Sequence, residues 1–254
     1  MSLVFNDTAT YRGLVQIYEK EIGANLGDIS GNIKKLKQFT ADVNLALDDF
    51  IRIALEASGT WQFDDSNHTT YPIIRTNLVS GQRDYQLTTD EGGNLILDVF
   101  KVLVADSSGR FHVVNPVDVQ SENDTQGFTN GANNTGAPST YDKTANAIFL
   151  DPIPGYNATL GLEVYINREG SYFVYTDTTK TPGVPGLFHR YFAIKPAYDY
   201  ARRNSLSVEG SLAAEVLKME GNRRLGVVGT IADYFGGRSR DERKRLEPAR
   251  DSNK

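Results

Sequence analysis

Acidic residues, histidines and paired glycines are the residues of this sequence that could form a catalytic or ligand-binding site. Asp64-Asp65 is a pair of carboxylates, and a glycosidase needs two of them. Adjacent residues in a loop need not converge on one substrate, however, so the pair favours a turn. His68, His112 and His189 are scattered without metal-ligand spacing, and His189 lies at a predicted helix start, which favours a capping or contact role. Gly92-Gly93 lacks the flanking pattern of a nucleotide loop and predicts a hairpin tip.

The motifs of common enzyme classes are absent from the sequence. It has no GxxxxGK[ST] phosphate loop, no HExxH zinc motif and no GxSxG nucleophile elbow. It also has no cysteine, which excludes disulfides, thiolate catalysis and cysteine-based metal sites. We therefore predict no catalytic, cofactor-binding or metal-binding residues, and no cofactor.

Composition predicts a folded chain with a sizeable core. Its 254 residues are 39% hydrophobic and 10% aromatic, enough for one large domain or two small ones. No apolar run reaches the roughly 18 residues of a membrane span. The first ten residues lack the basic and apolar regions of a secretory signal. These features favour a protein made in the cytoplasm, with no membrane partner.

The charge is unevenly distributed. Arg238–Arg250 has six basic and three acidic residues, a net charge of +3, which leaves −8 for the remainder of a chain whose total is −5. The body of the chain is therefore acidic and does not favour wrapping around nucleic acid, whereas its last segment is basic.

Helical periodicity opens and closes the chain. A first stripe predicts a helix that Thr8 or Thr10 caps and Gly23 or Gly27 ends; it comprises Tyr11, Leu14, Val15, Tyr18 and Ile22. A stronger stripe predicts a helix from about Asn32 to Ser58, with Gly59 as its stop. Helix returns at Phe188, where Pro196 predicts a kink or break unless packing compensates. A last helix begins at Glu209, and 225–235 is looser.

The middle of the chain has the patterns of β-strands. Ile73 to Val79 and Tyr85 to Leu87 predict a hairpin around Ser80-Gly81-Gln82, and 95–105 and 111–114 predict a second hairpin. The polar stretch 121–140 predicts a long loop. Ala147 to Leu150 and Leu160 to Ile166 predict two more strands.

These patterns predict an α+β fold. A discontinuous helical bundle is formed by 1–60 plus 186–236, an antiparallel β-rich unit is inserted at 61–185, and 237–254 is a basic tail.

Four landmarks give the chain a family resemblance. They are W-x-F-D-D-x-N from Trp61 to Asn67, L-V-S-G-Q-x-D-Y from Leu78 to Tyr85, A-I-F-L-x-P-x-P from Ala147 to Pro154, and P-x-x-P-x-x-F-H-R from Pro182 to Arg190. Their order and spacing, over roughly residues 10–220, resemble the head-to-tail connector adaptors of tailed bacteriophages, which are neck or head-completion proteins.

The resemblance implies a structural virion protein and not an enzyme. Such adaptors form a homo-oligomeric ring, usually of twelve copies, under the portal protein of the virion neck. The ring extends the channel for double-stranded DNA and offers a face to the next neck or tail protein. The resemblance therefore implies these partners, assembly after synthesis in the host cytoplasm, and a role in DNA ejection without sequence-specific binding.

We predict that the glycine-interrupted C-terminal segment docks on the portal. Its apolar residues would supply contact area and its basic residues would pair with carboxylates; the candidates are Arg223, Arg224, Val227, Val228, Ile231, Tyr234, Phe235, Arg238, Arg240, Arg243, Lys244 and Arg245. In an alternative, Arg223, Arg224 and the tail line the channel and hold the DNA end.

The long helix at 32–58 is the predicted subunit interface. Its charged face would pair across subunits through Lys35, Asp42, Asp49 and Arg52. Two other classes of protein stay open. One is a different tail or baseplate component or a glycan-binding module, and the other is an enzyme built on Asp64, Asp65 or Glu91.

Overall fold

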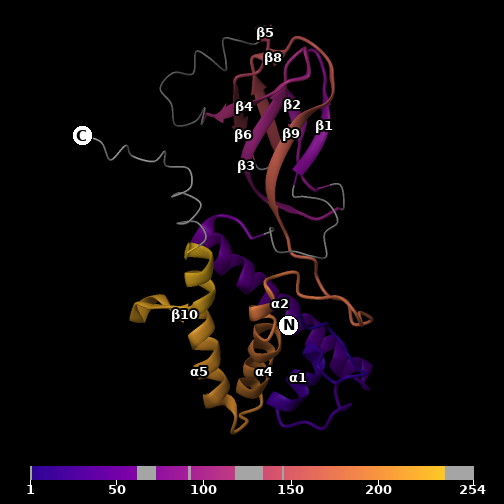
Figure 1. Ribbon diagram of the computed structural model, residues 1–254, viewed down its shortest axis with the longest axis vertical. Coiled ribbons are helices and arrows are strands. Elements are labelled where there is room, and N and C mark those ends of the chain that lie inside the picture. The colour runs from indigo at the N-terminus through magenta and orange to yellow at the C-terminus, as the bar shows by residue number, and fades with distance from the viewer. Residues whose placement is uncertain (1, 62–72, 91–92, 118–133, 145, 238–254) are drawn as a thin grey trace, which may run out of the picture. The chain divides into compact units, whose positions relative to one another are not determined.

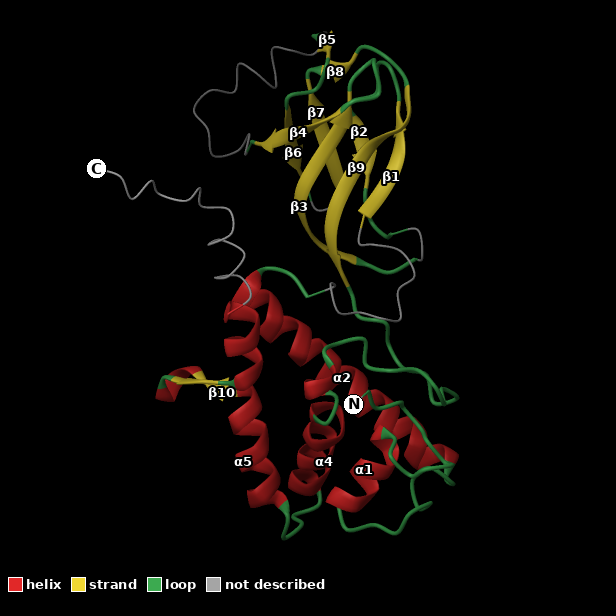
Figure 2. Cartoon of the chain, viewed as in Figure 1, coloured by secondary structure: helices red, strands yellow, loops and turns green. Residues whose placement is uncertain are grey.

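The chain forms two compact units (Figure 1). The computed structural model describes residues 2–61, 73–90, 93–117, 134–144 and 146–237. The helical unit combines Met1–Thr69 with Gly170–Lys254, and the β-unit is Thr70–Glu169. The predicted α+β class is confirmed; apart from the short β10–β11 pair in the helical unit, helices and strands are segregated between the units (Figure 2). Residues 170–185, expected in the insertion, belong with the helices because Phe173 and Val184 are buried in their core.

The first helix is shorter than predicted. α1 spans Leu14–Glu21, and Gly13, not Thr8 or Thr10, is its N-cap residue. Thr10 instead donates its backbone N–H to the Asp7 carboxylate at 2.9 Å. Tyr11 lies before the helix with a φ of 56° and is exposed. The helix begins later than the apolar stripe predicts, because the Asp7 side chain accepts the backbone N–H groups of Ala9 and Thr10 in a turn that precedes it.

The long helix confirms its prediction. α2 spans Ile33–Ser58; the Asn32 side chain accepts hydrogen bonds from the backbone N–H groups of Lys34 and Lys35, and Gly59 adopts the left-handed conformation. Its buried face includes Leu36, Phe39, Val43, Leu47, Phe50 and Ala54.

Two further helices complete the helical unit, in which α4 packs against α1, α2 and α5. α4 spans Tyr191–Arg203 after a short 3-10 turn, η2 (Gly186–Phe188), and α5 spans Glu209–Glu220. The helix continues through Pro196, which is itself buried. Its neighbours Tyr191, Phe192 and Ala197 are fully buried, so packing compensates for the lost hydrogen bond.

The end of the described chain departs from the looser helix expected there. β10 (Gly221–Asn222) pairs with β11 (Val227–Val228) across a 3-10 turn, η3 (Arg223–Leu225). Residues 230–237 are then helical. We call 221–229 the ribbon.

The β-unit is built on a seven-stranded sheet in the order β1-β9-β3-β4-β6-β7-β2. The strands are β1 (Ile73–Leu78), β2 (Asp84–Gln86), β3 (Ile96–Ala105), β4 (Phe111–Pro116), β6 (Thr140–Lys143), β7 (Ala147–Asp151) and β9 (Ala158–Arg168). β5 (Thr135–Gly136) and β8 (Ile153–Pro154) form a separate parallel pair. The large sheet is antiparallel except for the parallel β4–β6 pair, so it is mixed.

One of the two predicted hairpins is wrong. β3 and β4 form a hairpin as expected, but β1 pairs with β9 and β2 pairs with β7, at opposite ends of the sheet. The turn between them still holds, because the Tyr85 hydroxyl accepts a hydrogen bond from the Val79 N–H at 3.0 Å. Ile74 of β1 and Tyr85 of β2 are buried in one core, so the sheet curls around that core.

Some predictions fall outside the described residues. They concern Asp64, Asp65 and the rest of 62–67, together with His68, Glu91 and most of the 121–140 stretch.

Candidate protein-protein interface

The ribbon concentrates exposed apolar side chains in the helical unit. Leu225 and Val228 are each 70% exposed, and Val227 is 44% exposed. Burying such a side chain contributes about 1.5–3 kcal/mol, so a segment that holds three of them in solvent forgoes that stabilisation. Grouped exposed apolar residues mark contact surfaces. Figure 1 shows the ribbon projecting from the end of α5.

The local sequence builds this ribbon in a defined way. Gly221 has a φ of 80°, and a Cβ atom there would overlap the backbone of Val227 and Gly229. The Asn222 side chain accepts the backbone N–H groups of Arg224 and Leu225, at 3.0 and 3.2 Å. The two strands can approach closely only because glycine is at the base, and the asparagine fixes the turn. Leu225 and Arg224 are therefore held at the tip.

The predicted docking residues divide into three groups. Arg224, Val227 and Val228 are exposed on the ribbon, with Arg223 in its turn. Ile231 and Phe235 are fully buried in the core of the helical unit, and Tyr234 contacts Phe188 with a ring separation of 5.3 Å. These three pack against their own chain because 230–237 is helical and turns its apolar face inward. The remaining candidates, Arg238, Arg240, Arg243, Lys244 and Arg245, lie outside the described residues.

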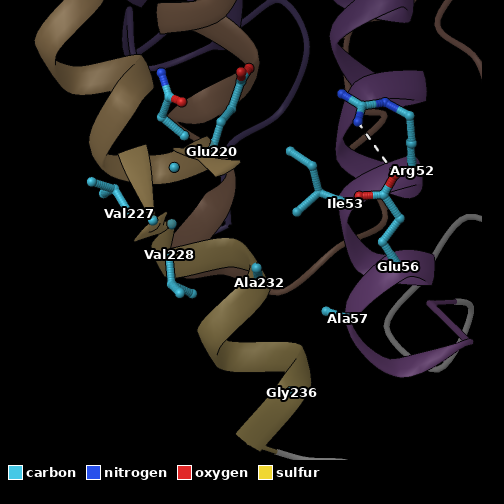
Figure 3. A pocket seen from close by; sticks show the side chains of 13 residues that line it. Arg52, Ile53, Glu56, Ala57, Glu220, Val227, Val228, Ala232 and Gly236 are labelled. Carbon is cyan, nitrogen blue, oxygen red and sulfur yellow. Dashed lines mark ion pairs between the residues drawn. The ribbon is translucent and has the colours of Figure 1, made fainter. Parts of the chain in front are cut away.

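A pocket of about 570 Å³ lies between α2 and the base of the ribbon (Figure 3). Arg52, Ile53 and Glu56 line it from α2, and Glu220 and Val228 line it from the other side. Arg52 pairs with Glu56 at 3.6 Å. The pocket thus combines apolar side chains with two carboxylates and one guanidinium.

Glu220 is fixed at the rim of this pocket by a buried tyrosine. The Tyr191 hydroxyl donates a hydrogen bond to Glu220 Oε1 at 2.7 Å. Burial of the Tyr191 ring and then the charge of Glu220 raise the pKa of the phenol, so it stays protonated and remains a donor. The Glu220 carboxylate is therefore positioned and keeps one oxygen directed away from the tyrosine.

A second concavity, of about 430 Å³, lies between α2 and α4. We call it the α2–α4 groove; it is lined by Asp42, Leu45, Asp48, Asp49, Lys195, Asp199, Arg202 and Arg203. Most of its charges pair within the chain. Arg203 lies 2.5 Å from Asp42, and that hydrogen bond raises the pKa of the guanidinium. Lys195 lies 3.0 Å from Asp199 and 3.9 Å from Asp49.

Two groove residues, Leu45 and Asp48, take no part in these ion pairs. Leu45 is 63% exposed, although it lies in the middle of α2. Asp48 accepts a hydrogen bond from the Tyr172 hydroxyl at 2.6 Å and has no basic partner among the described residues. Residues three apart on a helix share a face, so Leu45 and Asp48 form one small apolar and acidic patch.

The four charges predicted for the subunit interface lie in different places. Asp42 and Asp49 line the α2–α4 groove, whereas Arg52 lines the pocket beside the ribbon and is also 3.3 Å from Asp49. Lys35 is exposed near the start of α2. The structure therefore brings Asp49 close to Arg52 and into one groove with Asp42, but does not bring all four together. Leu45, Asp48 and the ribbon are not among the residues that the sequence predicts for an interface. Their signals in the sequence are a leucine off the buried stripe and the glycines at 221, 226 and 229 around two valines.

Among the described residues, no three His, Cys, Asp or Glu side chains come together as a group that could hold a metal ion. Within the same part of the chain, none of the helices is both long and apolar enough to span a membrane.

No protein-family model matches the chain, and no significant similarity to a curated protein was found.

Proposed function

We propose that this chain is a structural protein of the virion neck of a tailed bacteriophage, which forms a ring under the portal and connects the DNA-filled head to the tail. In this proposal the chain works by shape and contact, with no catalytic step and no cofactor. It is made in the host cytoplasm and becomes part of the virion on assembly.

One observation carries the proposal: the landmarks that resemble connector adaptors occur in order along a chain with the architecture that this resemblance implies, a helical bundle with an inserted β-unit. Both ends of the chain form the helical unit, and the β-unit is inserted between them. Three landmarks lie at turns or segment boundaries of the described chain. Leu78 to Tyr85 forms the turn between β1 and β2, Ala147 to Pro154 covers β7 and β8, and Pro182 to Arg190 leads into α4.

The last of these landmarks has a structural role that accounts for its residues. His189 is 3% exposed. Its Nδ1 accepts the Leu3 N–H at 2.8 Å, and its Nε2 lies 2.8 Å from the Val184 carbonyl oxygen. The histidine thereby joins the N-terminal segment to the chain that returns from the β-unit. Such a closure suits a rigid body that packs side by side in a ring.

Charge suits a channel through which DNA slides. Each copy has a net charge of −5, so a ring of such subunits is strongly acidic. Tight binding of DNA requires that Lys and Arg neutralise phosphates, and an acidic wall offers few such contacts. Salt-sensitive DNA binding by the isolated protein would instead favour the version in which Arg224 and the basic segment line the channel.

The basic segment Arg238–Arg250 is the proposed contact with the portal. Its arginine and lysine side chains would pair with portal carboxylates. A chain that ends at residue 236 is expected to lose portal binding while the helical unit keeps its fold. Binding of this shortened chain at wild-type affinity would exclude the basic segment as the contact.

Electron microscopy of the protein mixed with the portal of the same phage tests the proposal. The expected result is a ring of density under the portal, with matching symmetry. The shortened chain is the control, because it is expected to leave the portal bare. A portal that stays bare with the full chain under several salt conditions would overturn the adaptor role.

The described β-unit gives one observation in favour of the alternative, a glycan-binding module or another tail component. Phe100 is 45% exposed and lies 6.0 Å from the Tyr165 ring, over which the Lys101 ammonium lies at 5.1 Å. Exposed aromatic faces beside a polar group can bind sugar rings. Binding to a glycan array that Phe100→Ala abolishes would favour this alternative. Absence of binding would exclude a glycan site at Phe100.

A further inference from the structure

The ribbon and the α2–α4 groove match each other in chemistry. The ribbon tip presents Leu225, which is 70% exposed, next to Arg224, which is exposed and has no ion pair among the described residues. The groove presents Leu45, which is 63% exposed, next to Asp48, which has a tyrosine as its partner and no basic residue among those described. Each patch is one leucine beside one charge, and the two charges have opposite sign.

The two patches lie on different elements of the helical unit, so a contact between them joins two different surfaces. Such a heterologous contact between copies repeats from one copy to the next and closes into a ring when the rotation allows. A contact of one patch with itself, or a reciprocal contact in which each of two copies places its ribbon in the other's groove, would instead produce a two-fold dimer with no linked species beyond it. The ring in the proposed function requires the first kind of contact.

We infer that the ribbon of one copy docks in the α2–α4 groove of the next copy, with Leu225 against Leu45 and Arg224 paired with Asp48. This contact rests on the proposed function and gives its ring a subunit interface. The occupant of the groove is a second copy of this chain because the groove needs a leucine next to a basic residue, and the ribbon tip carries both.

The ribbon is suited to this role by its construction. The glycine contacts at its base and the Asn222 cap hold the tip in one conformation before binding. A pre-ordered tip loses little conformational freedom on docking. Arg203, Lys195 and Arg202 keep most of the groove aspartates paired within the chain, which leaves Asp48 as the carboxylate that an incoming arginine meets.

Disulfide trapping tests this contact directly, because the chain has no cysteine of its own. Leu225→Cys and Leu45→Cys in one chain are expected to give, on mild oxidation of rings assembled on the portal, a ladder of linked species beyond the dimer. The matched control pairs Leu225→Cys with Ile33→Cys, since Ile33 is 62% exposed and also lies on α2. This control is expected to remain monomeric on a denaturing gel.

The outcomes separate this inference from the adaptor role. Rings on the portal without the 225–45 link, or with links through Ile33 instead, would overturn the inferred contact while the adaptor role stands. A link between two copies of residue 225 in the single variant would replace the ring contact with a two-fold dimer. Absence of both rings and links would overturn both proposals, whereas a ladder in the free protein with a bare portal would support the contact and overturn the portal role.

A charge exchange provides an independent measurement. Arg224→Glu and Asp48→Lys each place like charges against one another and are expected to weaken self-association by about tenfold or more. The double variant restores the opposite charges and is expected to recover most of that loss. Single variants that associate like the wild type, or a double variant no better than the singles, would overturn the pairing of Arg224 with Asp48.

Discussion

The helical unit and the β-unit fill their interiors with different kinds of side chain. The helical core is rich in aromatic rings from distant parts of the chain; Phe5, Phe39, Phe50, Phe173, Phe188, Tyr191, Phe192 and Phe235 are all buried in it. The β-unit core consists largely of valine, leucine and isoleucine from one continuous stretch. The helical unit therefore depends on a few large contacts between segments far apart in sequence, and the β-unit on many small ones along its sheet.

A substitution at Phe50 is expected to destabilise the helical unit strongly. Its ring lies 5.4 to 6.0 Å from those of Phe188, Tyr191, Phe192 and Phe235. Phe50→Ala is expected to lower the free energy of unfolding of the helical unit by about 4 kcal/mol, the cost of a large cavity. The single tryptophan, Trp61, is buried in the same core, so its fluorescence during denaturant unfolding measures this loss.

Hydrogen exchange of the β-unit is the control for this substitution. Amides of β3 and β9 are expected to keep their protection in Phe50→Ala, while those of α2 and α4 lose it. Equal loss in both units would show that the two cores unfold as one and would remove the contrast between them. Phe50→Leu, which keeps most of the volume, is expected to cost less than half as much.

The β-unit has a sensitive point of its own, a buried ion pair. Arg168 Nη1 lies 2.8 Å from Asp90 Oδ2, and the two side chains are 3% and 6% exposed. Asp90→Asn removes the negative charge that faces the buried guanidinium and is expected to cost about 3 kcal/mol. Thermal unfolding, monitored by the circular dichroism of the β-sheet, measures this loss of stability. Asp98→Asn is the matched control, because the Asp98–Lys143 pair is exposed and such a pair contributes less than about 1 kcal/mol.

The Asp90–Arg168 pair makes the stability of the β-unit depend on pH. Burial alone would raise the pKa of Asp90, but the hydrogen bonds from Asn94 and the pairing with Arg168 together hold that pKa below its ordinary value of 3.8. A depressed carboxyl pKa stabilises the fold above the unfolded value, and this stabilisation is lost as the pH falls below it. The β-unit of Asp90→Asn is expected to lose less stability than the wild type between about pH 4 and 2; equal acid sensitivity would contradict this assignment.

A smaller effect is expected at the closure of the helical unit. Burial lowers the pKa of His189 below 6.5, so the neutral ring is the form that bonds Leu3 and Val184. Its stabilisation is present above the unfolded pKa and is lost as the pH falls below about 6.5. His189→Gln is expected to cost about 1–2 kcal/mol at pH 7.5 and to flatten the dependence of Trp61-detected stability between pH 7.5 and 5.5. A variant with the wild-type slope would show that other groups cause it.

Local signals in the sequence were sufficient for some elements. α2 begins and ends where Asn32 and Gly59 predict, because both its cap and its stop are adjacent residues. The β3–β4 hairpin follows in the same way from the Asp106 to Gly109 turn. The partners of β1 and β2 could not be predicted in this way. Their turn is correct, but pairing with β9 and β7 is decided by the shared core of the whole sheet.

The candidate interface shows the same limit. Helical spacing predicts which face of α2 is buried, and Leu45 is visibly off that face. Nothing in its neighbours along the chain indicates that α4 supplies the other wall of a groove. The sequence predicts Asp42 and Asp49 as charges available for pairing across subunits, yet Arg203 and Lys195 of α4 pair with them. Asp48 remained unselected because its lack of a basic partner is a property of the folded unit.

A substitution in the ribbon is expected to change stability least. It tests the contrast between buried and exposed side chains within the helical unit. Leu225→Ser is expected to alter the Trp61-detected free energy of unfolding by less than about 0.5 kcal/mol, because the side chain is 70% exposed. The matched control, Leu212→Ala on α5, removes a leucine that is 3% exposed and is expected to cost about 2–5 kcal/mol. A loss above about 1 kcal/mol in Leu225→Ser would mean that the ribbon packs on its own chain. Leu225 would then not be available to another copy, and the ribbon could not dock in the α2–α4 groove through this side chain.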